Sequence, residues 1–313
     1  MIPLCQAPLM QAAIEARRSG LLTYGITPPK ASFSPEKRRE VAHKQSERIR
    51  ALPIDGLVIY DLQDESERTP EARPFPFLET VEPLDYAYRD LASLTLPKVT
   101  YCCVAKHDRA SLSARLERIR AHAGLCTFVG AASRRQPASL RLPDAYALHR
   151  ESFADVPLGG VLIAERHGAT PGEDERVVRK MRDGCSFFIT QAVYSVVASK
   201  NVLSDLYYRA QASNQPLPPI LVTLSPCGSL KTLQFMRWLG ISAPRWLENE
   251  LTHAQDILET SLRICSDILA DLAEFCRSKH IPLGCNVESV SLRKEEIDAS
   301  VELVHRAHRL LGR

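Results

Sequence analysis

Residues 184–212, GCSFFITQAVYSVVASKNVLSDLYYRAQA, contain one complete unit of a strand followed by a helix. The short apolar run at 186–191 predicts a strand, and the longer stretch at 196–212, with apolar residues at helical spacing, predicts a helix. Strands that alternate with helices in this way are typical of a parallel sheet covered by helices. This stretch therefore indicates the α/β class.

The same unit recurs eight times along the chain. We expect strands at 20–27, 55–61, 98–105, 125–131, 159–164, 186–191, 219–224 and 284–287. The helices are expected at 34–52, 84–94, 110–123, 144–151, 173–182, 196–212, 230–239 and 294–311. The remaining segments are an N-terminal extension, loops at 69–77 and 165–172, and an extra helical stretch at 249–279 before the eighth strand.

Eight such units without a domain-sized break predict a single (β/α)8 TIM barrel over residues 1–313. The alternative is a doubly wound open sheet, which alternates strands and helices in a similar way. Such a sheet usually brings a glycine-rich turn after its first strand, and this chain has none. The barrel is therefore the favoured fold.

The composition excludes several classes of partner. The 313 residues carry 40 Lys and Arg against 37 Asp and Glu, and a net charge of +3 is too small to indicate a nucleic-acid or membrane partner. No apolar run approaches the roughly 20 residues that span a bilayer, and the N-terminus does not resemble a secretory signal. Nine cysteines without short-spaced pairing indicate neither disulfides nor a metal site. We expect a cytoplasmic protein.

In a barrel of this kind the active site lies at the carboxyl ends of the strands. The residues expected there are polar or ionisable on most strands, which favours a small-molecule site. They include Tyr60, Asp61, Ser133, Glu165, Gln191, Asn286 and Glu288.

Three further segments carry a family resemblance: Pro-Pro-Lys at 28–30, Gly-Cys-Ser-Phe-Phe-Ile-Thr-Gln at 184–191 and Ala-Pro-Arg-Trp at 243–246. In order and spacing they are similar to the methylenetetrahydrofolate reductase family, and the second segment is the most specific. The resemblance implies a barrel that binds FAD and folate in turn. It implies that hydride from NADH or NADPH reduces 5,10-methylenetetrahydrofolate to 5-methyltetrahydrofolate.

The resemblance also implies roles for individual residues. Gln191 matches a glutamine that contacts the folate pterin, and a carboxamide can donate and accept hydrogen bonds at once. Arg179 and Lys180 match a basic pair that reaches the flavin phosphates, and Glu173 matches an acidic residue that contacts the cofactor. Without the resemblance, the basic pair reads as a solvated helix face.

Three positions depart from the family's pattern. The family's general acid, a glutamate on the first strand, falls on Gly25, which has no proton to donate. An aspartate near the flavin ring falls at 130–133, where Ser133 offers only a hydroxyl. A threonine that touches the flavin falls near Tyr60.

A reductase without the first-strand glutamate needs another acid. Strands two and eight flank strand one in a closed barrel, and Asp61 and Glu288 end these two strands. A general acid needs a pKa raised toward the working pH, which burial can provide. We therefore expect Asp61 or Glu288 to replace the missing acid. The alternative is that each carboxylate caps the helix that follows it.

Two routes for hydride remain open, one through FAD and one directly from NADH or NADPH to the folate. The missing aspartate favours direct transfer, and Arg179 with Lys180 suits the phosphates of either dinucleotide. An alternative function is a folate-binding or methyl-transfer partner protein without reductase activity. Both functions belong to one-carbon metabolism, with methionine biosynthesis as one branch. The stretch at 249–279 packs on the barrel or pairs with a second subunit in a homo-oligomer.

Overall fold

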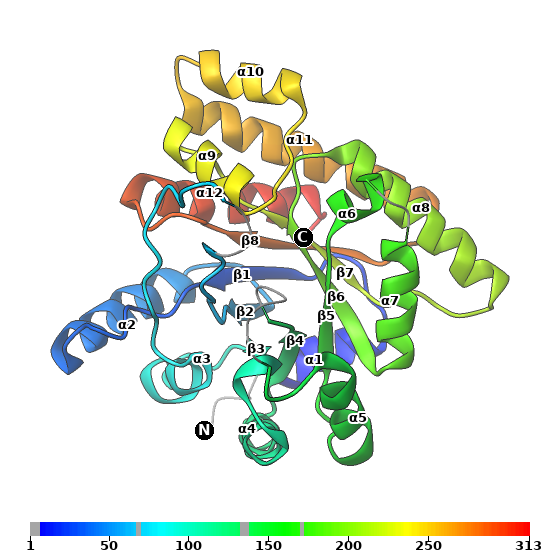
Figure 1. The fold of residues 1–313 in the computed structure, drawn as a ribbon. Helices are drawn as coiled ribbons and strands as arrows, with labels where there is room; N and C mark the ends of the chain where they lie inside the picture. The colour runs from blue at the N-terminus through cyan, green and yellow to red at the C-terminus, as the bar shows by residue number, and fades with distance from the viewer. Residues whose placement is uncertain (1–6, 67–69, 132–137, 170–171) are drawn as a thin grey trace.

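The computed structural model describes residues 7–66, 70–131, 138–169 and 172–313. Its strands are parallel and close into a barrel in chain order, from β1 to β8 (Figure 1). They are Leu22–Ile26 (β1), Gly56–Ile59 (β2), Lys98–Cys103 (β3), Leu125–Val129 (β4), Leu158–Leu162 (β5), Cys185–Ala192 (β6), Ile220–Leu224 (β7) and Leu283–Glu288 (β8). The predicted (β/α)8 barrel is confirmed.

Helices alternate with the strands and surround the barrel (Figure 1). They are Ala7–Glu15 (α1), Pro35–Arg50 (α2), Pro83–Asp85 (α3), Arg109–Ala121 (α4), Leu142–Ser152 (α5), Ala164–Ala169 (α6), Glu173–Arg182 (α7), Val196–Ala212 (α8), Leu230–Trp238 (α9), Arg245–His253 (α10), Ile257–Ser278 (α11) and Lys294–Leu310 (α12). A π-helical turn, Tyr86–Asp90 (η2), and a 3-10 turn, Val104–Lys106 (η3), complete the set. No helix among the described residues is long and apolar enough to cross a membrane.

Local sequence signals explain where several helices begin. Ser34 accepts a hydrogen bond from the N–H of Lys37, and Pro35 occupies the first helical position of α2. Ser195 caps α8 in the same way through the N–H of Ala198. The predicted first residues of these helices are therefore confirmed.

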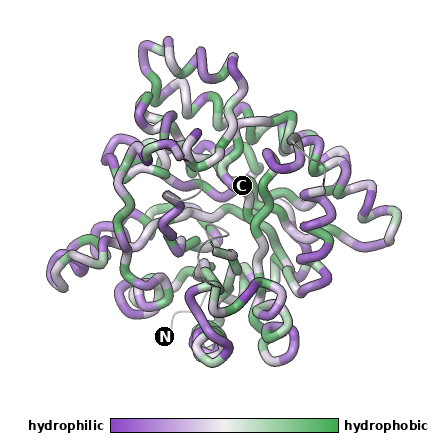
Figure 2. Tube along the Cα trace, viewed as in Figure 1, coloured by the Kyte–Doolittle hydropathy of each residue, from purple (hydrophilic) through white to green (hydrophobic). Residues whose placement is uncertain are grey.

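The strands separate two hydrophobic cores. The outer core lies between the strands and the helices, and the inner core fills the barrel with residues such as Val58, Phe187 and Leu221. Apolar residues run along the strands, whereas the outer helices mix polar and apolar residues (Figure 2). The N-terminal extension forms α1, which places Met10 and Ile14 in the inner core. Met10 lies close to Gly56 at the start of β2, so α1 fills the amino end of the barrel.

Three expected segments differ from the structure. The helix expected at 84–94 is divided into the single turn α3 and the π-helical turn η2. The loop expected at 165–172 contains α6, which ends before Pro171, a residue that disfavours helix in its predecessor. The helical stretch expected at 249–279 is two helices, because Asp256 caps α11 by accepting hydrogen bonds from the N–H groups of Leu258 and Glu259.

Candidate active site at the barrel mouth

Gly25, Tyr60 and Glu288 meet at the carboxyl ends of three adjacent strands. Gly25 in β1 is the register partner of Glu288 in β8 on one side and of Val58 in β2 on the other. Tyr60 directly follows β2, and its N–H donates to the carbonyl oxygen of Ile26. Barrel closure therefore brings residues from both ends of the chain to one point of the mouth.

The position of Gly25 has no room for a side chain. A Cβ atom there would lie 2.7 Å from Cε2 and 2.9 Å from the hydroxyl oxygen of Tyr60, and 3.2 Å from Cβ of Glu288. The ring of Tyr60 and the stem of Glu288 therefore occupy the space that a β1 side chain would fill. Tyr60 and Glu288 thus fill the space that a glutamate on the first strand would need.

A hydrogen-bond network orients the Tyr60 hydroxyl. Thr223 donates from Oγ1 to the carbonyl oxygen of Thr190 at 2.7 Å, so its Oγ1 accepts from Nδ2 of Asn286 at 3.2 Å. The other end of the amide, Oδ1 of Asn286, accepts from Oγ1 of Thr23 at 2.9 Å. With the amide fixed, Nδ2 also donates to the Tyr60 hydroxyl oxygen at 2.8 Å. The proton of Tyr60 is therefore not needed for Asn286 and is available to Glu288, whose side chain borders the same space beside Gly25.

Burial is the main influence on the pKa of the Glu288 carboxyl. Burial raises the pKa of Glu288 to about 7, and the hydrogen bond from Tyr60 lowers it to a smaller extent. Burial also raises the pKa of Tyr60 well above its ordinary value, and the neighbouring Glu288 carboxylate raises it further. Tyr101 from β3 packs edge-on against Tyr60, with ring centroids 4.9 Å apart. Glu288 is therefore poised to hold or release a proton near neutral pH.

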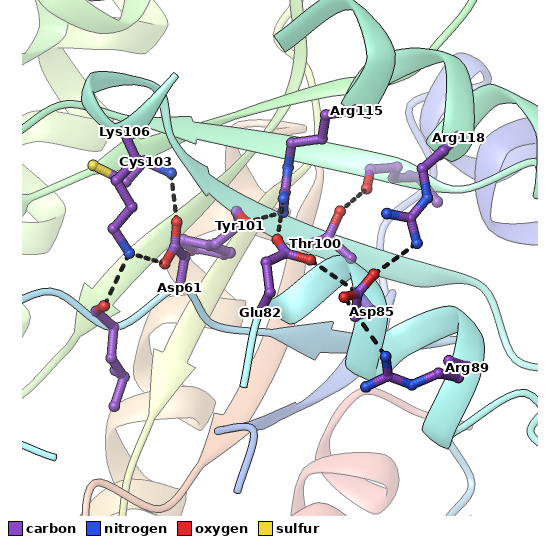
Figure 3. Close-up of polar contacts among 12 residues, drawn as sticks. Asp61, Glu82, Asp85, Arg89, Thr100, Tyr101, Cys103, Lys106, Arg115 and Arg118 are labelled. Carbon is purple, nitrogen blue, oxygen red and sulfur yellow. Dashed lines mark hydrogen bonds and ion pairs between the residues drawn. The ribbon is translucent and has the colours of Figure 1, made fainter. Parts of the chain in front are cut away.

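Asp61, the other candidate acid, is engaged elsewhere. Its Oδ2 accepts from the N–H of Cys103 at 2.8 Å, and its Oδ1 pairs with Nζ of Lys106 at 2.5 Å (Figure 3). The side chain is 7% exposed. Asp61 thus ties the end of β2 to the end of β3, and it caps no helix. Of the two candidates, Asp61 is thus the one that is paired with a cation.

Gln191 lies at the end of β6, beneath the end of α9. Its Nε2 donates to the carbonyl oxygen of Leu239 at 2.9 Å, and the side chain is half-buried. This hydrogen bond holds the carboxamide in place and leaves its oxygen and second N–H for a ligand.

Two of the residues that the resemblance assigns to the cofactor, Glu173 and Lys180, contact other groups of the protein. The Glu173 carboxylate is fully buried and accepts from the N–H of Ile163 at 3.1 Å and from Arg176 at 3.0 Å. The Lys180 ammonium donates to the carbonyl oxygen of Val161, and burial lowers its pKa. Arg179 is exposed on the outer side of α7. Ser133 lies outside the described residues.

The surroundings of α7 do not suit a pyrophosphate either. A cavity of about 490 Å³ opens beside it and is lined by His167, Asp174, Glu175, Asp205 and Arg209, among others. Arg209 pairs with Asp174 at 2.8 Å, so the one arginine there is already neutralised. This cavity therefore offers no unpaired arginine to a pyrophosphate. The described residues likewise contain no group of three His, Cys, Asp or Glu side chains placed to hold a metal.

Glu165, one of the polar residues expected at the barrel mouth, is a second buried carboxyl. It lies in the first turn of α6, and burial raises its pKa to about 7. Both carboxyl oxygens are buried, with no hydrogen-bond partner among the described residues. The sequence predicts that Glu165 lies at the end of a strand. Nothing in the sequence indicates that its carboxyl is buried without a cation among the described residues.

Comparison with known proteins shows a strong similarity to a solved structure. No family model and no curated protein matches the chain. An uncharacterized protein from Clostridium thermocellum, solved with two bound copies of 5-methyl-5,6,7,8-tetrahydrofolic acid, is 45% identical, with a TM-score of 0.82. The match covers 94% of this chain and 97% of that one.

Two dihydropteroate synthases are much more distant. The enzyme from Xanthomonas albilineans is 14% identical, with a TM-score of 0.46 and 92% of each chain covered. The enzyme from Vibrio fischeri ES114 is 13% identical, with a TM-score of 0.46 and with 95% of this chain and 94% of that one covered. Similarities of this size carry no information about function.

Proposed function

The chain belongs to the same family as the folate-binding protein from Clostridium thermocellum, and on this premise we propose that it binds a reduced folate at the barrel mouth. The observation that carries the proposal is 45% identity over 94% of the chain to a protein that binds 5-methyltetrahydrofolate. We further propose that the bound folate is reduced there, from 5,10-methylenetetrahydrofolate to 5-methyltetrahydrofolate.

The chemistry of the mouth supports reduction. A pterin ring presents donors and acceptors along one edge, and the free oxygen and N–H of Gln191 match such an edge. Converting the methylene bridge to a methyl group requires one proton and one hydride. Glu288 offers a carboxyl that holds its proton near neutral pH.

For the hydride, we propose direct transfer from NADH or NADPH rather than through FAD. The support is geometric. The buried carboxylate of Glu173 accepts from the N–H of Ile163, and the ammonium of Lys180 donates to the carbonyl oxygen of Val161, so both groups are bound to the protein itself. These are two of the side chains that the family resemblance assigns to flavin. A nicotinamide that reaches the mouth only for the reaction needs no such permanent cradle.

A spectrum and a titration test the proposal. The purified protein should lack the flavin band at roughly 450 nm and should bind 5-methyltetrahydrofolate in a calorimetric titration, which also gives the number of sites. NADH or NADPH should be oxidised only when 5,10-methylenetetrahydrofolate is present. A strong flavin band would contradict direct transfer. Folate binding without turnover by either nicotinamide would leave the folate-binding or methyl-transfer partner protein as the function.

A further inference from the structure

We propose that the proton donor for folate reduction has moved from β1 to β8, so that Glu288 is the general acid and Tyr60 its positioning residue. This inference rests on the proposed function and deepens it. Gly25, Tyr60 and Glu288 then depend on one another. Residue 25 must lack a side chain, because Tyr60 and Glu288 occupy the space beside it.

The space beside Gly25 is too small for a second acidic side chain. Gly25 and Glu288 are register partners, so a carboxyl on either strand starts from the same height in the barrel wall. A Cβ atom on residue 25 would lie 2.7 Å from the Tyr60 ring, which side chains do not tolerate. The mouth therefore accommodates an acid on β1 or the Tyr60–Glu288 pair, but not both.

The second step is orientation. The chain of hydrogen bonds from Thr190 through Thr223 to Asn286 makes the Tyr60 oxygen an acceptor, which leaves its proton for Glu288, the carboxyl whose stem lies beside Tyr60 at Gly25. One carboxyl oxygen of Glu288 can then accept the Tyr60 proton. The other oxygen is left to carry the acidic proton, and the side chain is only half-buried, so this oxygen can reach a ligand.

The third step is the charge environment of Glu288. Tyr60 from β2 and Tyr101 from β3 are the titratable groups whose interaction with it is resolved. Both are neutral near pH 7, because burial raises each tyrosine pKa above its ordinary value. Among the described residues, no lysine, arginine or histidine forms an ion pair with Glu288. Nothing there stabilises the carboxylate as a cation would, so the acid keeps its proton until a substrate nitrogen takes it.

The reaction balances with these groups. The product carries its methyl group on N5 and a hydrogen on N10, so the bond from N10 to the methylene carbon must break. Its electron pair stays on N10, which takes the proton of Glu288, and the cation that results is shared between N5 and the methylene carbon. Hydride from NADH or NADPH adds to that carbon and gives the methyl group and NAD⁺ or NADP⁺. Glu288 is left as a carboxylate that accepts from Tyr60 and regains its proton from solvent.

Two variants test the assignment in the full-length protein. Glu288→Gln should lower kcat by about 100-fold or more, while the Kd for 5-methyltetrahydrofolate changes by less than about threefold. The wild-type kcat should fall above about pH 7, because the acid must be protonated. Tyr60→Phe should move this fall to higher pH, because the hydrogen bond that lowers the pKa of Glu288 is lost. Glu295→Gln, an exposed carboxylate of α12, is the matched control and should behave as wild type.

The outcomes separate this proposal from the proposed function. A Glu288→Gln variant that binds folate and keeps kcat within about threefold of wild type overturns the acid assignment and leaves the reductase intact. An unchanged pH profile in Tyr60→Phe overturns the role of Tyr60. A wild-type protein that binds 5-methyltetrahydrofolate but oxidises neither nicotinamide overturns reduction and the acid together. Failure to bind the folate overturns the proposed function itself.

Discussion

Replacing Glu288 by glutamine removes one ionisable group from the barrel mouth and keeps its size, so the effect on stability depends on pH in a predictable way. Burial raises the pKa of Glu288 from 4.5 to about 7 in the folded protein. Below about pH 4.5, the carboxyl of Glu288 is protonated in both the folded and the unfolded chain. As the pH rises toward 7, the unfolded chain releases it and the folded chain does not, so the wild-type fold loses stability over this window.

The size of the effect follows from the shift. One pKa unit corresponds to about 1.4 kcal/mol, so a rise from 4.5 to about 7 corresponds to about 3 kcal/mol. The side chain is only half-buried, and water that reaches it weakens the effect. We therefore expect the free energy of unfolding of the wild type to fall by about 2 kcal/mol relative to Glu288→Gln between about pH 4.5 and pH 8.

Urea unfolding of both proteins across this pH range measures the difference directly. Glu165 is present in both proteins, so its own titration cancels in the comparison. Glu295→Gln controls for the loss of one exposed carboxylate. A difference between wild type and Glu288→Gln that stays constant to within about 0.5 kcal/mol across the range would refute the raised pKa, and with it the burial argument.

Three further substitutions have defined outcomes. Gln191→Ala should weaken binding of 5-methyltetrahydrofolate by about tenfold, because a placed hydrogen-bonding group is lost; equal affinity in calorimetry would exclude the pterin contact. Asp61→Asn should lower the free energy of unfolding in urea by about 1 to 2 kcal/mol through the lost pair with Lys106, with kcat unaffected by more than a few-fold; a loss of kcat as large as that of Glu288→Gln would instead make Asp61 the acid. Gly25→Ala should cost about 1 to 3 kcal/mol, because its Cβ would overlap the Tyr60 ring; thermal unfolding equal to wild type would show that the ring moves freely.

The barrel was predictable because its signals are local. Short apolar runs such as 220–224 and amphipathic stretches such as 196–212 are visible within a window of a few turns, and caps such as Ser34 set the helix ends. The predictions differed from the structure where local signals conflict. Gly168 and Pro171 mark a loop by composition, yet α6 forms over Ala164–Ala169 and includes Gly168. Asp256 divides a stretch whose apolar spacing continues.

The candidate acids were predictable as a pair but not individually. The order of strands in a closed barrel places both Asp61 and Glu288 beside β1. The choice between them depends on partners that are distant in sequence: Lys106 lies 45 residues from Asp61, and no cation reaches Glu288 among the described residues. The same holds for Glu173 and Lys180, whose charges suit a cofactor in sequence but bind neighbouring protein groups in the structure.

The sequence by itself determined the strand and helix order, the end of the barrel that carries the site, and the absence of a proton donor at Gly25, because these follow from residue types and periodicity along the chain. Only the tertiary structure distinguishes the two candidate carboxyls, because it shows that Asp61 pairs with Lys106 and that Glu288 is buried beside Tyr60. Thr23 and Asn286 are 263 residues apart, and their hydrogen bond helps to orient the Tyr60 hydroxyl toward Glu288. The burial that raises the pKa of Glu288 exists only when the barrel closes and brings β8 against β1.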